Sequence, residues 1–506
     1  MEIDMKKSIF AYLLLMTFFV CGCRKNPDTN AVISKNDGSF DIKVIQSATE
    51  TIQESYDNHN RSENGTLIET EPTQYQFKYQ SQFTSSDNSV DFTIDLHTNL
   101  TDLPMPVVEV APHRITIEDA KRVANVLFGN VTFYEAEPLG MEVFSKAEIQ
   151  AKINRLLSYE GALGHYDSNT FSSARKQFVE EYTLKMETAP EENPHQLCPW
   201  EYRKSSYYYL TTEELSTIDT SQDNDELQVR VNVAGIPYLM IISTRDRSDY
   251  KINNIYVTID DGPSPLFADM YIFQNQLCQT AEPDEENVTA VSQKTFEMLQ
   301  QMNLGDWAIS ECYVEVINQG DFPEYIIVVN AVPQYENVSA VRIPQITGLT
   351  SEEAYASNYY LTNAQFMFNV SGTLLSMEII SPIDMVSLIN NNVLTLGFDE
   401  LMIRAENQLK LSDYHAYDRL QLISMGYEDY FCTVYINDAD YGLARVKVPN
   451  TDDSYYYVPA IFFYGTIQYQ GKETDSIYDV TIEEEVRRPI LVLNAIDGSI
   501  IHTTNG

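Results

Sequence analysis

The sequence predicts an α+β protein in which amphipathic helices pack on one face of antiparallel sheets, as helix-plus-sheet units repeated in two domains. Many short segments alternate apolar with polar residues, which is the period of a half-buried strand. Three amphipathic helices, beginning near Thr116, Thr289 and Phe398, each lead through a short turn into such alternation. The chain also contains 34 tyrosines, a residue that favours strands showing one face to water.

The N-terminal domain is expected to span residues 73–280. Its first helix starts at Thr116, because Asp119 stands three residues later as in a capping box. The other expected helices are Ser145–Leu157 and Thr170–Met186. The expected strands are the alternating stretch Tyr75–Tyr79, then Val90–Leu96, Val107–Val110, Leu227–Val233, Tyr238–Thr244 and Asn253–Ile259.

The C-terminal domain is expected to span residues 281–506, and its boundary is placed at the polar run Pro283-Asp284-Glu285-Glu286. Helices are predicted at Thr289–Met302 and Phe398–Leu409. Ser371-Gly372 predicts a tight hairpin between Phe366–Val370 and Thr373–Met377. The remaining expected strands are Trp307–Ile317, Tyr325–Val332, Phe431–Ile436, Leu443–Val448, Tyr455–Tyr464, Ile490–Leu493 and Ser499–Ile501.

Residues 1–22 have the three parts of a secretion signal. Lys6 and Lys7 precede an apolar run, Ser8–Val20, which is too short to span a membrane. Val20-Cys21-Gly22-Cys23 then resembles the lipobox of bacterial lipoproteins, which implies cleavage between Gly22 and Cys23 and a lipid on the Cys23 thiol. The alternatives are an ordinary secretory signal with a chance cysteine, or an uncleaved N-terminal helix. Glu2 and Asp4 are unusual in such a signal, so translation starts at either Met1 or Met5.

Residues 23–72 are polar and predict a flexible tether, with at most one short helix at Ile42–Glu54. The chain carries 33 basic and 74 acidic residues, a net charge of −41, and removal of residues 1–22 leaves that charge unchanged. Such a field repels nucleic acid, whose recognition needs a basic surface. The expected location is therefore the extracytoplasmic face of a cell membrane, where the lipid on Cys23 holds a soluble acidic body.

Four cysteines remain beyond the signal, namely Cys198, Cys278, Cys312 and Cys432. Their spacing matches no Cys-x-x-C motif. Outside the cytoplasm they can pair in three ways, of which Cys278 with Cys312 is the least distant in sequence, or they remain free thiols.

No catalytic motif is convincing. Ser173 and Lys176 match the Ser-x-x-Lys of penicillin-interacting enzymes, but no Lys-Thr-Gly occurs. His195 and Cys198 are a single pair, whereas a zinc site needs about four ligands. The acidic loop with Asp219, Asp223, Asp225 and Glu226 lacks the spacing and the glycine of an EF-hand. We therefore expect no catalytic, cofactor or metal site.

Two resemblances bear on function. Tyr457-Val458-Pro459-Ala460 and Leu493–Ile500 resemble the closing strands of PepSY-like proteins and of extracytoplasmic regulators that restrain a histidine kinase in Gram-positive bacteria. In those proteins a strand, a glycine turn, a strand and a helix recur, and Phe366–Ile380 followed by Leu396-Gly397-Phe398-Asp399-Glu400 looks like that order. This resemblance covers residues 281–506.

Nearly the whole chain also resembles a family of Gram-positive lipoproteins of unknown function. The carrying residues are Cys23-Arg24-Lys25, Pro104–Arg114, Thr116–Ala120, Val458-Pro459 and Asp497-Gly498. That family brings no catalytic residues. The expected function is thus a non-enzymatic lipoprotein that binds another protein, such as a membrane protein, as a regulator or sensor subunit. The alternative is a surface lipoprotein that binds a glycan or a peptide through tyrosine-rich sheet faces.

Overall fold

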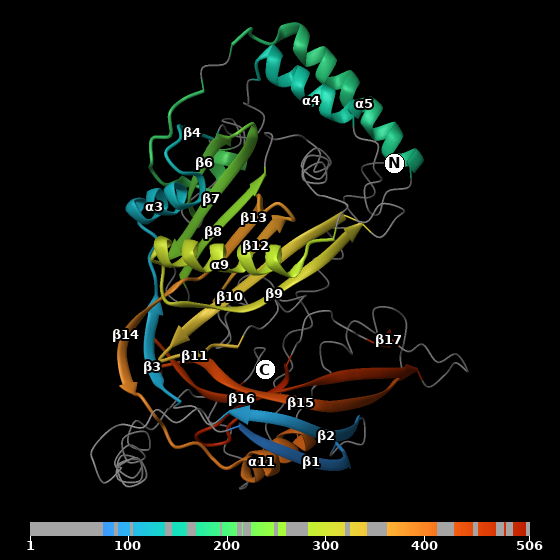
Figure 1. Cartoon of the computed structure of the whole chain (residues 1–506), viewed down its shortest axis with the longest axis vertical. Coiled ribbons are helices and arrows are strands. Elements are labelled where there is room, and N and C mark those ends of the chain that lie inside the picture. Colours follow the sequence, from blue (N-terminus) through green and yellow to red (C-terminus); the bar gives the residue numbers. More distant parts are fainter. Residues whose placement is uncertain are drawn as a thin grey trace. The chain divides into compact units, whose positions relative to one another are not determined.

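Two β-sheets, here called sheet A and sheet B, form the framework of the chain (Figure 1). The computed structural model describes residues 74–85, 90–101, 105–136, 144–158, 168–192, 195–209, 215, 224–246, 251–259, 282–318, 324–341, 362–411, 430–448, 454–471, 480–481 and 489–501. The predicted signal with Gly22 and Cys23, and the tether of residues 23–72, lie outside these ranges.

Sheet A has eight strands in the order β1-β2-β15-β16-β3-β14, with β17 and β18 also paired to β16. Its strands are β1 (Gln74–Thr84), β2 (Val90–Thr101), β3 (Val107–Pro112), β14 (Ile383–Asn390), β15 (Tyr430–Lys447), β16 (Tyr455–Gly471), β17 (Val480–Thr481) and β18 (Pro489–Asn494). The pairing of β2 with β15 is parallel, and the other pairs are antiparallel.

Sheet B has ten strands in the order β11-β10-β12-β13-β8-β7-β6-β4, with β9 also paired to β10 and β5 to β6. Its strands are β4 (Phe133–Glu135), β5 (Arg203–Lys204), β6 (Asp225–Val233), β7 (Ile236–Asp246), β8 (Lys251–Ile259), β9 (Trp307–Asn318), β10 (Glu324–Tyr335), β11 (Val338–Ser339), β12 (Asn363–Asn369) and β13 (Leu374–Ile380). All of its pairs are antiparallel.

The chain begins in sheet A, builds sheet B, and then returns to sheet A. Strands β1–β3 and β14–β18 belong to sheet A, while β4–β13 belong to sheet B. The sequence predicts a domain boundary between residues 280 and 281. In the structure β8, before that point, pairs with β13, after it, so sheet B continues across the predicted boundary.

The described helices are α3 (Ile117–Phe128), α4 (Lys146–Ser158), α5 (Ser168–Thr188), α6 (Ser206–Tyr209), α9 (Glu285–Met302) and α11 (Phe398–Leu411). The capping box predicted at Thr116 is present, since the Asp119 amide donates to the Thr116 side chain and Asp119 accepts from the Thr116 amide. Helix α9 begins earlier than predicted, because Asp284 caps it and Glu285 and Glu286 occupy its positive first turn. The acidic run that suggested a boundary is therefore a helix start.

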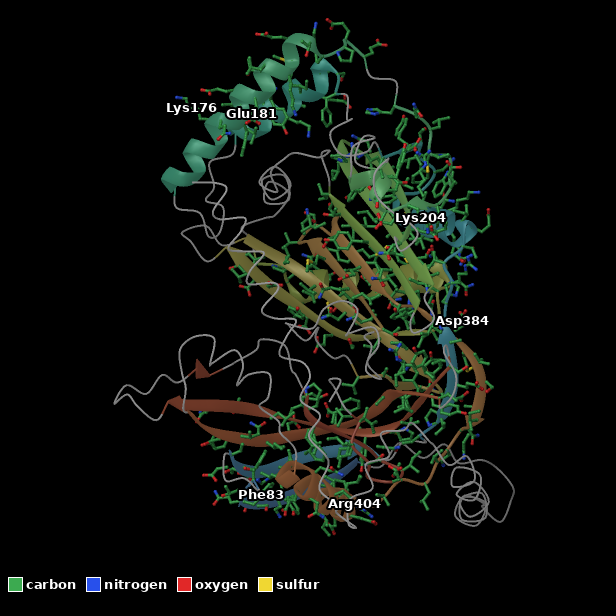
Figure 2. The ribbon with its side chains drawn as sticks, turned by 180° about the vertical axis from the view of Figure 1, so that it is seen from behind. Phe83, Lys176, Glu181, Lys204, Asp384 and Arg404 are labelled. Atoms are coloured by element: carbon green, nitrogen blue, oxygen red, sulfur yellow. The ribbon has the colours of Figure 1, made fainter. Side chains whose placement is uncertain are left out.

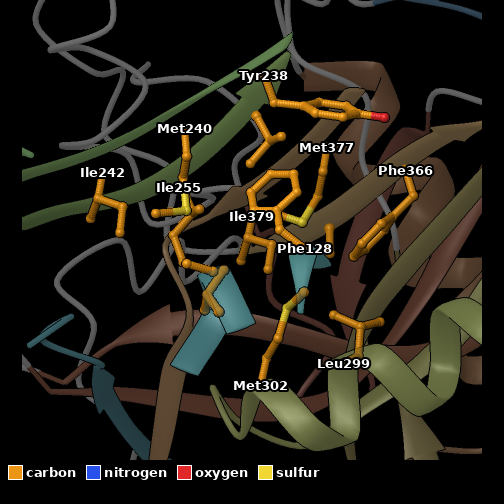
Figure 3. Packing of buried hydrophobic residues seen from close by; sticks show 14 of the residues in the cluster. Phe128, Tyr238, Met240, Ile242, Ile255, Leu299, Met302, Phe366, Met377 and Ile379 are labelled. Atoms are coloured by element: carbon orange, nitrogen blue, oxygen red, sulfur yellow. The ribbon is translucent and has the colours of Figure 1, made fainter. Parts of the chain in front are cut away.

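Helices α3 and α9 cover one face of sheet B, and Figure 3 shows the core between them. Met302 and Leu299 of α9 and Phe128 of α3 meet apolar side chains from alternate positions of the strands, such as Met377 and Phe366. Each large side chain buried in this way contributes about 2 kcal/mol. Helix α11 forms a separate core with sheet A.

The α+β class with mostly antiparallel sheets is confirmed. The hairpin predicted at Ser371-Gly372 is also present, and the Asn369 side chain accepts from the Ser371 and Thr373 amides to close it. This hairpin lies in sheet B, whereas the helix that follows Leu396-Gly397 packs on sheet A. Within the described ranges, no helix is both long enough and apolar enough to span a membrane.

Candidate functional site

Strand β14 forms an edge of sheet A that the sequence analysis did not predict. It is the last strand in the order of the sheet and pairs antiparallel with β3; among the described strands, β3 is its only partner. The register shifts between Met385 and Ser387, so Val386 is the extra residue of a bulge. A second shift lies between Leu388 and Asn390.

Three apolar side chains of β14 are exposed. The exposed fractions are 53% for Met385, 56% for Val386 and 41% for Leu388. The bulge accounts for two consecutive exposed residues, because it interrupts the alternation that would turn one of them inward. Between them Ser387 donates from Oγ to Oε2 of Glu109 on β3, at 3.0 Å. We call Met385, Val386 and Leu388 the apolar edge.

An ionic cluster fixes the start of β14. Asp384, labelled in Figure 2, accepts a hydrogen bond at 2.9 Å from Nδ1 of His113, which follows β3. Nε2 of the same imidazole lies 3.4 Å from Oδ2 of Asp119 on α3. The His113 amide also donates to the Pro382 carbonyl at 2.8 Å. Residues from β3, α3 and β14 are thus joined at this point, which we call the junction.

Asp119 is the most heavily bonded acid of the junction. It accepts from the Thr116 amide at 2.8 Å and from the Thr116 hydroxyl at 2.7 Å, and it pairs with Arg122. Burial acts to raise the pKa of Asp119, but these hydrogen bonds and the nearby His113 outweigh it and hold the pKa below its usual value. Arg122 in turn donates from Nε to the Met302 carbonyl of α9 at 2.7 Å.

Backbone contacts hold the crossing from β13 to β14. Ser381, between these strands, has a φ of 43°, and its amide donates to the Asn253 carbonyl on β8 at 3.0 Å. A Cβ atom at Gly305 would lie 2.8 Å from the Ile383 carbonyl oxygen, so only glycine allows this approach. The first residues of β14 are therefore positioned by sheet B and by the loop after α9, while its apolar edge is left exposed.

The structure places most of the motifs singled out in the sequence apart from one another, as far as its described residues reach. Ser173 and Lys176 lie on α5, where the Lys176 side chain is exposed. His195 contacts Glu148 at 2.9 Å rather than Cys198, and Asp225 pairs with Lys204 at 2.8 Å. Among the described residues no group of three or more His, Cys, Asp and Glu side chains converges. Asp219 and Asp223 lie outside the described ranges.

Two of the four cysteines can be assigned. Cys198 and Cys312 are free thiols, and burial raises the pKa of each, which makes them poor nucleophiles. Cys278 lies outside the described ranges, and for Cys432 only the backbone, in β15, is described. The predicted lipidation residue Cys23 and cleavage residue Gly22 also lie outside.

The apolar edge escaped prediction because its residues do not alternate. Met385, Val386, Leu388 and Ile389 form an apolar run interrupted only by Ser387, and two register shifts explain why the run does not alternate. The sequence signal that could have revealed this strand was its position, since the short segment lies between the predicted hairpin at Ser371-Gly372 and the predicted helix that begins at Phe398.

The chain was compared with known proteins at the levels of sequence and fold. No protein-family model matches it, and no curated protein does. A structural similarity links it to the crystal structure of an uncharacterized protein from Eubacterium rectale, with a TM-score of 0.36 and 9% sequence identity, over 84% of this chain and 93% of that one.

Proposed function

We propose that this chain is an extracytoplasmic lipoprotein, held at a bacterial cell membrane by lipid on Cys23, that binds an extended segment of another protein along β14. It would act as a regulator or sensor subunit rather than as an enzyme. The observation that carries the proposal is the apolar edge: three exposed apolar side chains on a strand whose outer side is unpaired among the described strands.

An exposed edge strand offers a row of backbone donors and acceptors. An added strand satisfies them and covers neighbouring side chains, which is the mode called β-augmentation. Proteins usually protect such edges with charges, prolines or bulges. Here β14 has bulges, and Asp384 puts a charge at its start, but Met385, Val386 and Leu388 after it are apolar and exposed. This combination favours a specific partner over general aggregation.

The charge of the chain defines the chemistry of the partner. The net charge is −41, and Asp384 at the start of the apolar edge is itself more than half exposed. A segment that alternates apolar with basic residues would place apolar side chains on Met385, Val386 and Leu388 and its charges in a favourable field. We therefore expect a basic, apolar strand.

The alternative, a surface lipoprotein that binds a glycan or a peptide, also has a supporting observation. Tyr256 on β8 and Tyr313 on β9 are exposed and lie on the face of sheet B opposite to α3 and α9. Exposed aromatic rings on a sheet face suit flat ligands. This face is distinct from the apolar edge.

The lipid anchor is tested by metabolic labelling of the full chain with an alkyne fatty acid. The label should be present on the native chain and lost in Cys23→Ser. Cys21→Ser is the matched control, because Cys21 lies in the same short segment but is removed with the signal, and it should keep the label. A native chain without label would overturn the anchor.

The binding mode is tested with a synthetic peptide that alternates lysine and valine. We expect the full chain to bind it, and we expect N-methylation of alternate peptide amides to abolish binding, because strand addition needs those donors. A peptide that alternates glutamate and valine should bind far more weakly. Equal binding of the N-methylated peptide, or self-association through β14 that excludes the peptide, would contradict the proposal.

A further inference from the structure

A straight row of polar side chains crosses five strands of sheet B on the face opposite to α3 and α9. Its members are direct cross-strand neighbours: Glu311 (β9), Asn330 (β10), Gln365 (β12), Glu378 (β13) and Tyr256 (β8). Their chain neighbours, such as Met377 and Ile379 beside Glu378, point into the helix-covered core. With strands about 4.8 Å apart, the row extends over roughly 19 Å. We call it the acceptor row.

The orientation of the amides in the row follows from the carboxylate at its end. An ionised carboxylate only accepts, so Asn330 must donate its NH2 group to Oε2 of Glu311, at 3.1 Å. The Asn330 oxygen is then left to accept from Nε2 of Gln365, at 3.0 Å. The NH2 groups of Asn330 and Gln365 therefore both point along the row toward Glu311, and each donates to the residue before it. The oxygen of Gln365 makes no hydrogen bond within the part of the chain that the structure describes.

Glu378 is the next member of the row, and no described residue compensates for the partial burial of its carboxylate. Among the described residues it makes no hydrogen bond and no ion pair. It is partly buried, and this burial raises its pKa. A carboxylate that loses part of its hydration without gaining a hydrogen-bond donor is destabilised, and a ligand that donates hydrogen bonds to it would offset that cost.

The Tyr256 end of the row is exposed to solvent, although sheet B continues there into β7. Tyr256 lies directly across from Glu378 and is 41% exposed. At the other end the row approaches sheet A, because the charges of Asp440 and Glu311 both add to the effect of burial that raises the pKa of Tyr464 on β16. A ligand would therefore reach Glu378 from the Tyr256 side.

We propose that Glu378, the Gln365 oxygen and the Tyr256 ring form a binding site for an organic ammonium group, from a polyamine or from a lysine side chain. The site offers the Glu378 carboxylate and the Gln365 oxygen as acceptors, with the exposed Tyr256 ring beside them on the next strand. A carboxylate and an amide oxygen accept hydrogen bonds from an ammonium, and an adjacent aromatic ring adds a cation–π interaction. This site is independent of the apolar edge and would persist if β14 bound no partner.

The experiment titrates the full chain with spermidine and, separately, with N-acetyl-lysine methylamide, which distinguishes the two sources of the ammonium. We expect saturable binding in at least one arm, and a loss of about tenfold to a hundredfold in affinity in Glu378→Gln. Glu180→Gln, which removes an exposed acid on α5, is the matched control for the change in net charge and should leave affinity within twofold.

A second readout locates the site. Fluorescence or chemical shifts of Tyr256 should respond to the amine in the native chain and not in Glu378→Gln. n-Butanol, which has a similar alkyl chain but no charge, should give no response. Equal amine binding in Glu378→Gln, preference for a neutral disaccharide over both amines, or no binding in either arm would each overturn the proposal.

Discussion

Asp119 at the junction and Glu378 in the acceptor row are both partly or largely buried acids, yet the protein treats them in opposite ways. Asp119 accepts from Thr116 twice and pairs with Arg122, and its pKa falls. Glu378 gains no donor within the described part, and burial raises its pKa. Burial alone therefore does not determine the role of an acid. The hydrogen-bond donors around the carboxylate determine whether its pKa falls or rises.

The difference assigns different roles to the two regions. The junction ties β3, α3 and β14 together and so positions the apolar edge, which makes its acid part of the scaffold. In the acceptor row, by contrast, no described residue donates a hydrogen bond to the partly buried Glu378 carboxylate. A partly buried acid with a raised pKa and no donor beside it is a candidate for a ligand-binding residue.

The largest expected effect comes from Asp119→Ala. The substitution removes the capping box of α3 and leaves Arg122 without its carboxylate, so we expect a loss of about 3 kcal/mol in the free energy of unfolding. Urea denaturation measures it. Glu118→Ala, an exposed acid in the same first turn, is the control and should cost less than about 0.5 kcal/mol. Equal losses would show that the bonds of Asp119 contribute little.

Glu378→Gln is expected to raise the free energy of unfolding, whereas Asp119→Ala lowers it. An amide of the same shape carries no charge to desolvate, so the variant should gain about 1 kcal/mol in the same assay. The Glu180→Gln variant should be unchanged. A destabilised Glu378→Gln chain would mean that the carboxylate has a partner in the folded protein, and the comparison with Asp119 would fail.

The contributions of Asp119 and Glu378 to stability should also depend on pH in different ways. Because the pKa of Asp119 is lowered from 3.8 in the fold, its contribution is present above 3.8 and is lost as pH falls through the lowered pKa. The pKa of Glu378 is raised above 4.5, so its cost is present at neutral pH and disappears below 4.5, where both states are protonated. The gain from Glu378→Gln should therefore vanish at acid pH. A gain that is the same at pH 7 and below 4.5 would contradict this account.

The smallest effect on stability is expected at the apolar edge. Val386→Lys changes an exposed side chain and should alter the free energy of unfolding by less than about 0.5 kcal/mol. Affinity for the lysine–valine peptide should nevertheless fall by about tenfold. The new lysine on β14 repels the lysines of the peptide and replaces an apolar contact. Ile403→Lys on α11, where Ile403 is 58% exposed, is the control and should leave peptide affinity unchanged.

Local signals allowed much of the fold to be predicted. Thr116 with Asp119, the alternation through Val90–Leu96 and the Ser371-Gly372 turn each specify their elements within a few residues. The pairing of distant strands was not predictable in this way. Strands β2 and β15 are more than three hundred residues apart and pair in parallel, and no local pattern encodes that partner choice.

The candidate sites were less predictable than the elements. β14 lacks a period because of its bulges, so the apolar edge could not be identified. Glu378 is one of 74 acids, and only the register of the three strands β12, β13 and β8 places it beside Gln365 and Tyr256. Motifs such as His195 with Cys198 stood out because their residues are close in sequence, but in the fold His195 contacts Glu148 and Cys198 is a buried free thiol.

Amide hydrogen exchange of the full chain, measured with and without the lysine–valine peptide, shows whether β14 accepts an added strand. We predict slower exchange for alternate amides of residues 384–390, with the amides of α5 unchanged as an internal reference. Exchange along β14 that stays the same while the peptide is bound, or protection confined to another strand, would contradict the account.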